Sequence, residues 1–599
     1  MKTKAFAKKN IKSFATLLLI FWIGAVLRFT GLNWDQGHHL HPDERFLNML
    51  VNDISLPESW SGYLDPARSP LNPRNHGRDF YVYGNWPITL SKLANELTNA
   101  EGLGEVALVG RALSAAAYSA TIILVYFLAL VIQQKLKKNK KTILPQSTAH
   151  WAALTYALIV LPIQQAHFFT TDAFLAMFLT CSMLTAFTHL FSDNSFNPNR
   201  IILSAICFGM ALGSKITALL FLPLILLALF VKELPSLRQS APSTVIKIFS
   251  TLSIFMFVSY LTVRLTSPYL FASANFLNPA PAPELVSNLQ QLKSFEGSDV
   301  WFPPAIQWIN RPATFGLTNM AFFGMGLGSF LFLCCGVFLL FKTLLQKKLL
   351  LALLQSPLEK NGHPQLILIA TLVWTLSFII YYSLQFVTSV RYFYPIYPIL
   401  SVFGGVGVSL ILQSFKNSAM RTLATSLTLL AISLWPLMFI NIYLQPHSRI
   451  QASHWIYQNI PTSSLLLSEH WDDALPLHLP NYQHRYQVEQ LPVFGADTPE
   501  KWQEMEEMFT QADYYILSSN RAWGSITRVP EKYPQMSQFY EDLFADKTQY
   551  QLIAKFSVYP SLEYLGIPIS FNDNWAEEAF SVYDHPEVYV FKIKSYTID

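Results

Sequence analysis

Residues 105–133 read EVALVGRALSAAAYSATIILVYFLALVIQ, an almost uninterrupted apolar stretch. About 20 apolar residues in a helix cross the roughly 30 Å hydrocarbon core of a bilayer, so this stretch predicts a membrane-spanning helix. Runs of the same kind recur along most of the chain. We expect eleven spans, at about residues 13–32, 105–133, 149–166, 172–191, 200–214, 215–231, 246–265, 317–341, 366–387, 392–413 and 422–444.

The composition agrees with this prediction. Of the 599 residues, 52% are hydrophobic and 13% are charged, whereas about a quarter of a soluble domain is charged. We therefore predict an α-helical polytopic membrane protein. The net charge of +4 comes mostly from basic residues in the loops, so no nucleic-acid partner is expected. All four cysteines, Cys181, Cys207, Cys334 and Cys335, fall inside predicted spans, which argues against a disulfide framework or a cysteine-based metal site.

Basic residues concentrate in alternate loops, the pattern that marks the cytoplasmic side of a membrane protein. They are Lys2, Lys4, Lys8, Lys9, Lys12, Lys135, Lys137, Lys138, Lys140, Lys141, Lys232, Arg238, Lys247, Lys342, Lys347, Lys348, Lys360, Lys416 and Arg421. With the N-terminus inside, eleven spans place the tail after residue 444 outside. The first run lacks a clear small-residue cleavage site, so we expect a retained anchor rather than a signal peptide.

The chain divides into a membrane domain, residues 1–444, and a small extracytoplasmic α/β domain, residues 445–599. In the membrane domain, the first outer loop, residues 33–104, is far longer than a connection needs. In the tail, residues 465–468, 514–519, 551–557 and 588–593 predict strands, and residues 499–511 and 534–544 predict helices.

Acidic residues lie at the outer ends of two spans. Asp43 and Glu44 follow the first span, and Asp172 opens the fourth. Carboxylates are costly near hydrocarbon and usually mark function, and a carboxylate within about 3 Å of a hydroxyl can act as its general base. The alternative is that the first pair only caps a helix or pairs with Arg45.

Four cations are expected at the same depth, namely Arg111, Lys215, Arg264 and Arg391. Together they would suit an anionic group such as a phosphate, or each would extend singly to the lipid headgroups. His38, His39 and His41 do not have the spacing of a zinc motif. In the tail, we expect turn and capping roles, rather than catalytic ones, for Glu469, Asp472, Asp473, Asp584 and His585.

The order of these residues resembles that of the GT-C glycosyltransferases. The most similar branch is family 39, which holds protein O-mannosyltransferases and lipid A aminoarabinose transferases. The matching pieces span about residues 13–445: His41-Pro42-Asp43-Glu44, Arg111 in Arg-Ala-Leu-Ser, Phe168-Phe169-Thr170-Thr171-Asp172, Gly213-Ser214-Lys215, and Arg391-Tyr392 with Pro395 and Pro398.

The resemblance implies that a sugar moves, with inversion, from a polyprenyl-phosphate donor to an acceptor hydroxyl at the outer face. It implies that Asp43 is the base, Glu44 its partner in the acceptor site, and Asp172 part of a second acidic loop. Arg111 would support the carboxylates. The lipid phosphate would be held by Lys215, Arg264 or Arg391, with Tyr392 alongside. The acceptor stays open between protein, lipid and glycan, and a divalent cation is optional.

Two further features narrow what the resemblance implies, the first about the donor and the second about the source of the protein. The aminoarabinose transferases carry a Lys-Pro-Pro element in the first outer loop, but residues 81–87 here read YVYGNWP and contain no lysine. This difference argues against an aminoarabinose donor. Residues 576–586 resemble the tails of prokaryotic members, which implies a cell-envelope protein in the plasma membrane of a prokaryote.

A transporter or flippase of a lipid-linked or anionic substrate is the main alternative function. Transporters need ionisable groups near the bilayer midplane and often contain repeated halves. Here the acids gather at one side and no repeat is visible, which favours the enzyme. A scaffold for envelope assembly, in which the acids have no catalytic role, is the third alternative.

Overall fold

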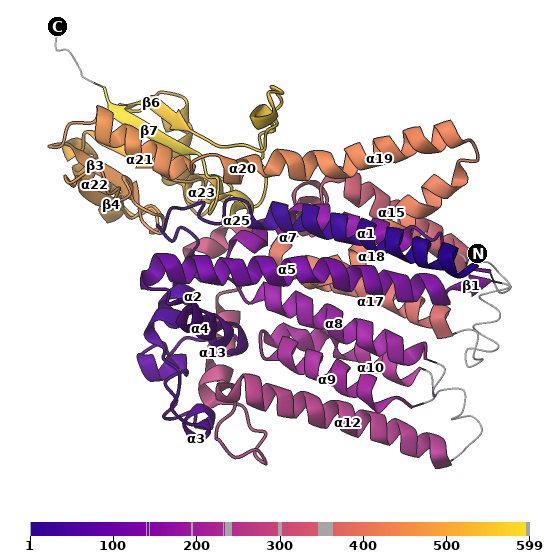
Figure 1. Cartoon of the computed structure of the whole chain (residues 1–599). Coiled ribbons are helices and arrows are strands. Elements are labelled where there is room, and N and C mark those ends of the chain that lie inside the picture. Colours follow the sequence, from indigo (N-terminus) through magenta and orange to yellow (C-terminus); the bar gives the residue numbers. More distant parts are fainter. Residues whose placement is uncertain are drawn as a thin grey trace, which may run out of the picture.

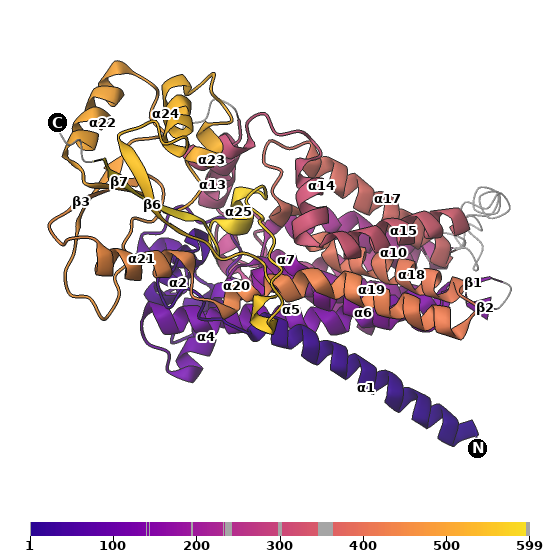
Figure 2. The same ribbon diagram turned by 90° about the horizontal axis from the view of Figure 1, so that it is seen from above.

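The computed structural model describes residues 2–138, 141–142, 144–192, 196–231, 233, 242–297, 302–344 and 363–594. Long helices run side by side in a bundle, and a small domain of helices and strands lies at one end of it (Figures 1 and 2). Among the basic residues that predict the orientation, Lys140, Lys232, Arg238, Lys347, Lys348 and Lys360 lie outside the described residues.

Helices form at each of the eleven predicted apolar runs. They are α1 (Lys2–Phe29), α5 (Gly102–Lys135), α6 (Thr148–Leu158), α7 (Val160–Gln164), α8 (Asp172–Leu190), α9 (Pro198–Leu212), α10 (Leu222–Phe230), α12 (Pro242–Thr266), α14 (Phe315–Asn319), α15 (Leu327–Leu344), α17 (His363–Ser383), α18 (Tyr397–Ser414), α19 (Ser418–Phe439) and α20 (Asn441–Leu444). In the described residues, seven helices are long and apolar enough to cross a membrane, or eight if a bent pair counts as one span. The structure thus shows a polytopic helical protein but does not confirm the predicted count of eleven.

The three runs that fall short of a full span are interrupted helices. Residues 149–166 divide into α6 and α7, where Ile159 is extended. Between α9 and α10, Lys215 has an extended backbone and a 3-10 helix, Ile216–Phe221, follows it. Irregular backbone at membrane depth is tolerated where protein surrounds it or where it lines a cavity. One of the predicted site residues therefore lies at a helix break.

The centre of the bundle depends on close helix contacts. Helix α5 contacts α1, α6 and α8, and α18 contacts α6 and α15. A Cβ at Gly405 of α18 would lie 2.4 Å from the backbone nitrogen of Ala152 in α6. Small residues allow this approach, which is how membrane helices gain packing energy without a hydrophobic driving force between them.

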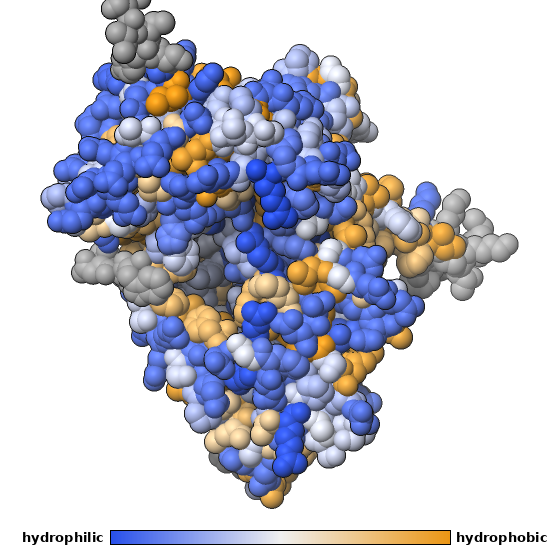
Figure 3. Space-filling view, turned by 90° about the vertical axis from the view of Figure 1, so that its left-hand side faces the viewer, coloured by the Kyte–Doolittle hydropathy of each residue, from blue (hydrophilic) through white to orange (hydrophobic). Residues whose placement is uncertain are grey.

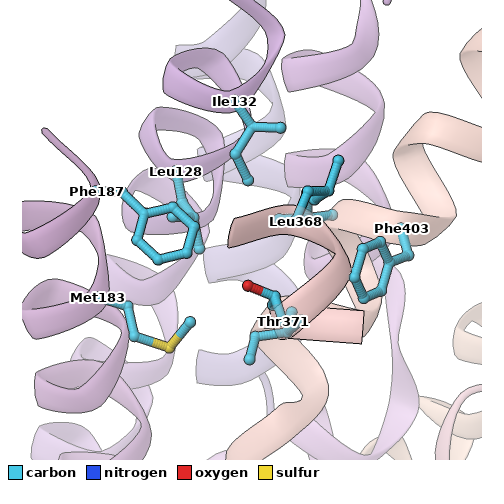
Figure 4. Close-up of a pocket in the computed structure, with 9 residues that line it drawn as sticks. Leu128, Ile132, Met183, Phe187, Leu368, Thr371 and Phe403 are labelled. Atoms are coloured by element: carbon cyan, nitrogen blue, oxygen red, sulfur yellow. The ribbon is translucent and has the colours of Figure 1, made fainter. Parts of the chain in front are cut away.

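A small pocket lies deep among these helices (Figure 4). It is lined by Leu128 and Ile132 of α5, Met183 and Phe187 of α8, Leu368 and Thr371 of α17, and Ile399, Val402 and Phe403 of α18. Leu128 is roughly 25 Å along α5 from Arg111 at 1.5 Å per residue. The pocket is apolar and remote from the predicted charged site, so we do not assign the chemistry to it.

The long loops gather at the end of the bundle where the tail lies (Figure 1). The first loop contains α2 (Pro42–Asp53), α3 (Trp60–Leu64), a 3-10 helix (Pro73–His76) and α4 (Trp86–Thr98), and the second contains α13 (Pro283–Ser294) and 3-10 helices at Pro268–Leu270 and Pro303–Trp308. The N-terminus and the hairpin of β1 (Lys137–Lys138) and β2 (Lys141–Thr142) lie at the opposite end.

The tail forms a five-stranded sheet flanked by helices. Its elements are α21 (Ser448–Asn459), β3 (Leu465–Glu469), β4 (Gln487–Leu491), α22 (Pro499–Gln511), β5 (Tyr514–Leu517), α23 (Trp523–Ile526), α24 (Pro534–Phe544), β6 (Tyr550–Phe556), α25 (Glu578–Ser581) and β7 (Val588–Ile593). The strand order is β4-β3-β5-β7-β6, with β4, β3 and β5 parallel and β7 antiparallel to both of its neighbours. All four predicted strands and both predicted helices are confirmed.

The long connection between β6 and β7 returns to the bundle. The Ser561 N–H donates to the Met438 carbonyl at 2.9 Å, and the Tyr443 hydroxyl donates to Oδ2 of Asp584 at 2.7 Å. His585 forms hydrogen bonds with both Asp584 and Asp573. The Asp584 carboxylate is thus held by Tyr443 on one side and by His585 on the other. The connection therefore ties the tail to α20 and to the end of α19 that precedes it.

Candidate active site

Helix α2 begins with the acidic pair that the sequence marks as catalytic. Nδ1 of His41 accepts the Glu44 N–H at 3.2 Å, and Pro42 occupies the first turn, where no backbone donor is needed. Successive residues of a helix point about 100° apart, so the two carboxylates face different surroundings. The Asp43 side chain is 38% exposed, whereas Glu44 is fully buried.

Asp43, Asp172, Lys215 and Arg391 form one group, which we name the outer cluster. Oδ2 of Asp43 accepts an N–H from Nη1 of Arg391 at 2.5 Å. The Nε of this guanidinium donates to Oδ2 of Asp172 at 3.0 Å, and Lys215 Nζ donates to Oδ1 of Asp172 at 2.7 Å. Asp172 is buried, whereas both cations are partly exposed. The buried carboxylate thus holds two cations that remain accessible.

Asp35, Glu44 and Arg111 form a second group, the inner network. Arg111 donates Nη1 and Nη2 to the two Asp35 oxygens at 2.9 and 2.8 Å, and Nε and Nη2 to the two Glu44 oxygens at 2.8 and 2.7 Å. Its last N–H goes to the Leu32 carbonyl at 2.8 Å. A guanidinium has five N–H donors, so Arg111 has none left for an anion.

The inner network also holds the chain segment before α8. Oε1 of Glu44 accepts the Phe169 N–H at 2.8 Å, three residues before Asp172. Glu44 therefore faces inward to Arg111 and Phe169 rather than standing beside Asp43. The two acids of α2 thus have different partners in the structure, and their shared role in an acceptor site stays a prediction.

The first-loop segment Tyr81–Pro87 packs against the helix break at Lys215. The Gly84 N–H donates to the Ser214 carbonyl at 3.1 Å, and the Trp86 N–H donates to the Gly213 carbonyl at 3.2 Å. A Cβ at Gly84 would lie 1.9 Å from the Gly213 oxygen, so only glycine allows this approach. The segment that lacks the lysine of the aminoarabinose transferases thus lies beside Lys215.

Arg264 and Tyr392, two of the predicted binding residues, lie differently with respect to the outer cluster. Arg264 donates to the Ser273 and Asn275 carbonyls, and its guanidinium lies 4.4 Å from the centroid of the Phe271 ring. It stabilises the loop that follows α12 rather than joining the outer cluster. Tyr392 follows Arg391 directly, and its partly exposed ring lies 5.8 Å from that of Tyr382.

The electrostatics differ between the two acids of α2. Burial raises the pKa of Asp43, but the charge and hydrogen bond of Arg391, together with His41 and Lys215, outweigh burial, and the pKa lies below its ordinary value. For Glu44, burial is the larger effect and raises the pKa despite Arg111. The charge of the Asp43 carboxylate, and to a smaller extent burial, raises the pKa of Tyr83 well above 10.0. Tyr83 therefore stays a neutral hydroxyl close to Asp43.

The tail contacts the chain next to both members of the Asp43–Arg391 pair. Arg45 Nη2 donates to Oδ1 of Asp473 at 2.7 Å, and the His41 ring lies 4.3 Å from that of Tyr583. On the other side, Glu577 accepts the Ser389 hydroxyl at 2.7 Å and the Val390 N–H at 2.8 Å. Seen from this end, the surface is mostly hydrophilic, with hydrophobic side chains between the tail above and the first loop below (Figure 3).

Sequence reasoning missed Asp35, Tyr83 and Glu577. The sequence did contain a signal for Asp35, because it is an acid directly after the first apolar run and Trp34. In the structure, the ring of Trp34 lies 5.0 Å from the Arg111 guanidinium. Glu577 had none beyond the resemblance of its segment. Among the described residues, no group of three His, Cys, Asp or Glu side chains is placed to hold a metal ion.

Residues 89–238 match the family model described as the protein O-mannosyl-transferase TMEM260 N-terminal domain. This segment contains Arg111, Asp172 and Lys215. No curated protein sequence was found to match the chain.

The structure is similar to that of the Archaeoglobus fulgidus oligosaccharyltransferase tethered to an acceptor peptide. The TM-score is 0.50 at 12% identity, over 97% of this chain and 88% of that chain. Archaeal oligosaccharyltransferase AglB of Archaeoglobus fulgidus, with an inhibitory peptide and a dolichol-phosphate, has a TM-score of 0.48 at 12% identity, over 95% and 75% of the two chains. ArnT from Cupriavidus metallidurans has a TM-score of 0.35 at 12% identity, over 81% and 92%. The chain has the GT-C fold, as the sequence resemblance implies.

Proposed function

We propose that this chain is a membrane glycosyltransferase that moves a sugar from a polyprenyl-phosphate donor to an acceptor hydroxyl on the extracytoplasmic face. The observation that carries the proposal is the outer cluster, in which Asp43 contacts Arg391 while Asp172 holds both Arg391 and Lys215. A GT-C fold around this cluster supports the assignment to glycosyl transfer.

The two cations of the outer cluster suit the donor phosphate. Arg391 and Lys215 are partly exposed, and the extended backbone at Lys215 brings its side chain to Asp172. Cations that face the leaving phosphate stabilise the negative charge it gains as the sugar–oxygen bond breaks. Asp172 keeps both cations in place, and Tyr392 lies at the edge of this group. Arg264, engaged with its own loop, has no part in the proposal.

Asp43 is the proposed general base. It takes the proton of the acceptor hydroxyl, the acceptor oxygen bonds to the anomeric carbon on the face opposite the phosphate, and the electron pair of the broken bond leaves with the polyprenyl phosphate. One displacement inverts the anomeric centre. The donor phosphate competes with Asp43 for Arg391, so donor binding raises the pKa of Asp43 and makes it a stronger base.

The inner network has a supporting role in this scheme. Arg111 fixes Asp35 on the loop before α2 and Glu44 on its first turn, and Glu44 in turn holds Phe169. These contacts set the relative position of Asp43 and Asp172. We therefore assign Glu44 and Arg111 to positioning rather than to contact with substrate.

Further parts of the proposal rest on the sequence. We place the tail outside, the enzyme in the plasma membrane of a prokaryote and the chain in family 39, with eleven crossings that include the interrupted helices. The matched description names a protein O-mannosyl-transferase, so a protein hydroxyl and a mannosyl donor are the first pair to test. A transporter is not favoured, because the ionisable cluster lies at one end of the bundle rather than at its middle.

The test is turnover by the purified protein in nanodiscs with a panel of polyprenyl-phosphate sugars and a cell-envelope extract, read by mass spectrometry. Asp43→Asn should lower kcat about 100-fold or more. Asp53→Asn is the matched control, since Asp53 lies on the same helix in an ion pair with Arg78 at 2.8 Å. Unchanged turnover in Asp43→Asn would contradict the base, and no transfer from any donor by the unaltered protein would contradict the reaction.

A further inference from the structure

The C-terminal domain contacts the segment that carries Arg391 through one buried carboxylate. Oε2 of Glu577 accepts the Val390 N–H at 2.8 Å, and Oε1 accepts the Ser389 hydroxyl at 2.7 Å. The oxygen of that hydroxyl accepts the Arg391 N–H at 3.3 Å. A chain of hydrogen bonds thus links Glu577 to the backbone of the arginine itself.

Glu577 is itself anchored to the bundle. Its backbone N–H donates to Oδ1 of Asn319 in α14 at 2.8 Å. In the same helix, a Cβ at Gly316 would lie 2.6 Å from the Thr388 carbonyl, so α14 and the Arg391 segment are in close contact. Glu577 fills the space where tail, α14 and this segment meet, and it is 1% exposed.

The Asp43 side of the pair has a corresponding contact. Asp473 accepts Arg45 at Oδ1 and Arg449 at Oδ2, at 2.7 and 2.8 Å. Nε of Arg45 donates to the His39 carbonyl at 2.7 Å, so the contact fixes both the first turn of α2 and the loop that leads into it. The Tyr583 ring covers His41, which caps this helix.

We infer that the C-terminal domain is a positioning part of the active site, in which Glu577 sets the place of Arg391 and Asp473, through Arg45, sets that of Asp43. The inference rests on the proposed function, because it takes Arg391 and Asp43 as the groups that meet donor and acceptor. Both carboxylates act through another residue, and neither is assigned to substrate. A misplacement of about 1 Å, caused by a change away from the reacting atoms, can lower the rate about 100-fold.

Glu577→Ala removes the acceptors of Ser389 and Val390. It should raise the donor KM and lower kcat, each about tenfold, with the acceptor KM within about twofold, because Arg391 is assigned to the donor. Glu577→Gln keeps an oxygen for the Val390 N–H and an amide for the Ser389 hydroxyl, so it should restore most of the activity. Arg45→Gln, at a side chain that is partly exposed, should lower kcat with the donor KM unchanged.

Glu587→Gln is the matched control. Glu587 is also a buried tail glutamate, and its contacts with Lys555, Tyr559 and Tyr589 lie within the tail. This variant should leave both KM values unchanged. A merely structural role for Glu577 would reduce the folded fraction and apparent kcat with no change of donor KM, which would overturn the inference.

Hydrogen exchange of residues 388–392 separates this inference from the proposed function. Glu577→Ala should speed exchange there, and Glu587→Gln should not. If the unaltered protein transfers no sugar from polyprenyl-phosphate mannose or the other donors while Glu577→Ala speeds this exchange, the reaction is wrong and the positioning contact stands. If exchange and donor KM both stay unchanged in a folded Glu577→Ala protein, the positioning contact is wrong.

Discussion

Arg111 uses all five of its N–H donors on Asp35, Glu44 and the Leu32 carbonyl, and its side chain is 1% exposed. Removing one member of a buried ion pair leaves the others charged and unpaired, at a cost of about 3–5 kcal/mol. We expect Arg111→Ala to lower the thermal unfolding midpoint markedly in detergent. A variant with an unchanged midpoint and a raised donor KM would show instead that Arg111 binds the phosphate.

Lys215 contrasts with Arg111, because its ammonium makes one ion pair and stays partly exposed. We expect Lys215→Ala to raise the donor KM about 10- to 100-fold, in line with a lost charge-assisted bond of about 1.5–3 kcal/mol, with little loss of stability. Lys92→Ala is the control, since Lys92 pairs with Glu96 in α4 at 3.1 Å. Steady-state kinetics at varied donor concentration measure the effect, and an unchanged donor KM would remove Lys215 from the phosphate site.

Glu469 lies in the core of the tail, where burial outweighs hydrogen bonds from Tyr540 and Tyr515 and raises the pKa from 4.5 to about 7. Well below pH 4.5 the group is protonated in both the folded and the unfolded state. As the pH rises from 4.5 to about 7, the unfolded state loses this proton before the folded state does. The free energy of unfolding therefore falls, by roughly 3 kcal/mol in total.

The variant Glu469→Gln should abolish this part of the pH dependence. Its amide oxygen can still accept both tyrosine hydroxyls, which now bond to Oε1, and no ionised form has to be buried. Chemical unfolding of the protein and the variant at pH 5 and pH 8 gives the comparison. An equal pH dependence in both proteins would show that Glu469 keeps an ordinary pKa.

At the scale of elements, hydrophobic runs predicted helices because lipid-exposed backbone must bond within its own segment. The boundary between the predicted runs 200–214 and 215–231 coincides with the break at Lys215, but the contacts of Gly213 and Ser214 with the distant first loop were not predictable. In the tail, the mostly buried and apolar strands β3, β5 and β7 were predicted from their side chains. Strand β4 was missed because Gln487–Leu491 is polar and lies at the sheet edge, with β3 as its neighbour.

The segment Ser561–Trp575 presents apolar side chains beside α19, and we expect it to lie in the outer leaflet. Ile567 and Ile569 are exposed, while the Tyr564 hydroxyl donates to the Leu437 carbonyl at 2.8 Å and Phe571 packs against Trp435. Exposed apolar surface next to a membrane helix is favourable where lipid covers it.

A nitroxide at Ile569→Cys, in a chain whose native cysteines are replaced, measures this placement in nanodiscs. Its collisions with oxygen should exceed those with a water-soluble nickel complex. Ile553→Cys on β6 is the control, because Ile553 is exposed on the tail and should favour the nickel complex. Equal behaviour of the two labels would place the segment in water.

At the scale of the molecule, the site joins residues from the first loop, three parts of the bundle and the tail. Residue type and topology were enough to select Asp43, Asp172, Lys215 and Arg391, since charged groups at helix ends are informative. Which cation meets which acid was not predictable, because the pairs join residues up to 348 positions apart. Arg264 was expected at the same depth as these residues, but its guanidinium bonds the Ser273 and Asn275 carbonyls instead. Expected depth alone therefore did not predict membership of the cluster.

The orientation of the whole chain can be tested through the two ends of the bundle. Helix α2, which carries Asp43 of the outer cluster, and the tail share one end, and the N-terminus lies at the other (Figure 1). Glu504 on α22 and Lys416 between α18 and α19 are both exposed, so cysteines placed there report the two sides. In intact cells, a membrane-impermeant maleimide should label Glu504→Cys. It should label Lys416→Cys only after the cells have been permeabilised. The reverse pattern would place Asp43 and the tail in the cytosol, where lysine-rich loops belong, and would exclude sugar transfer at the outer face.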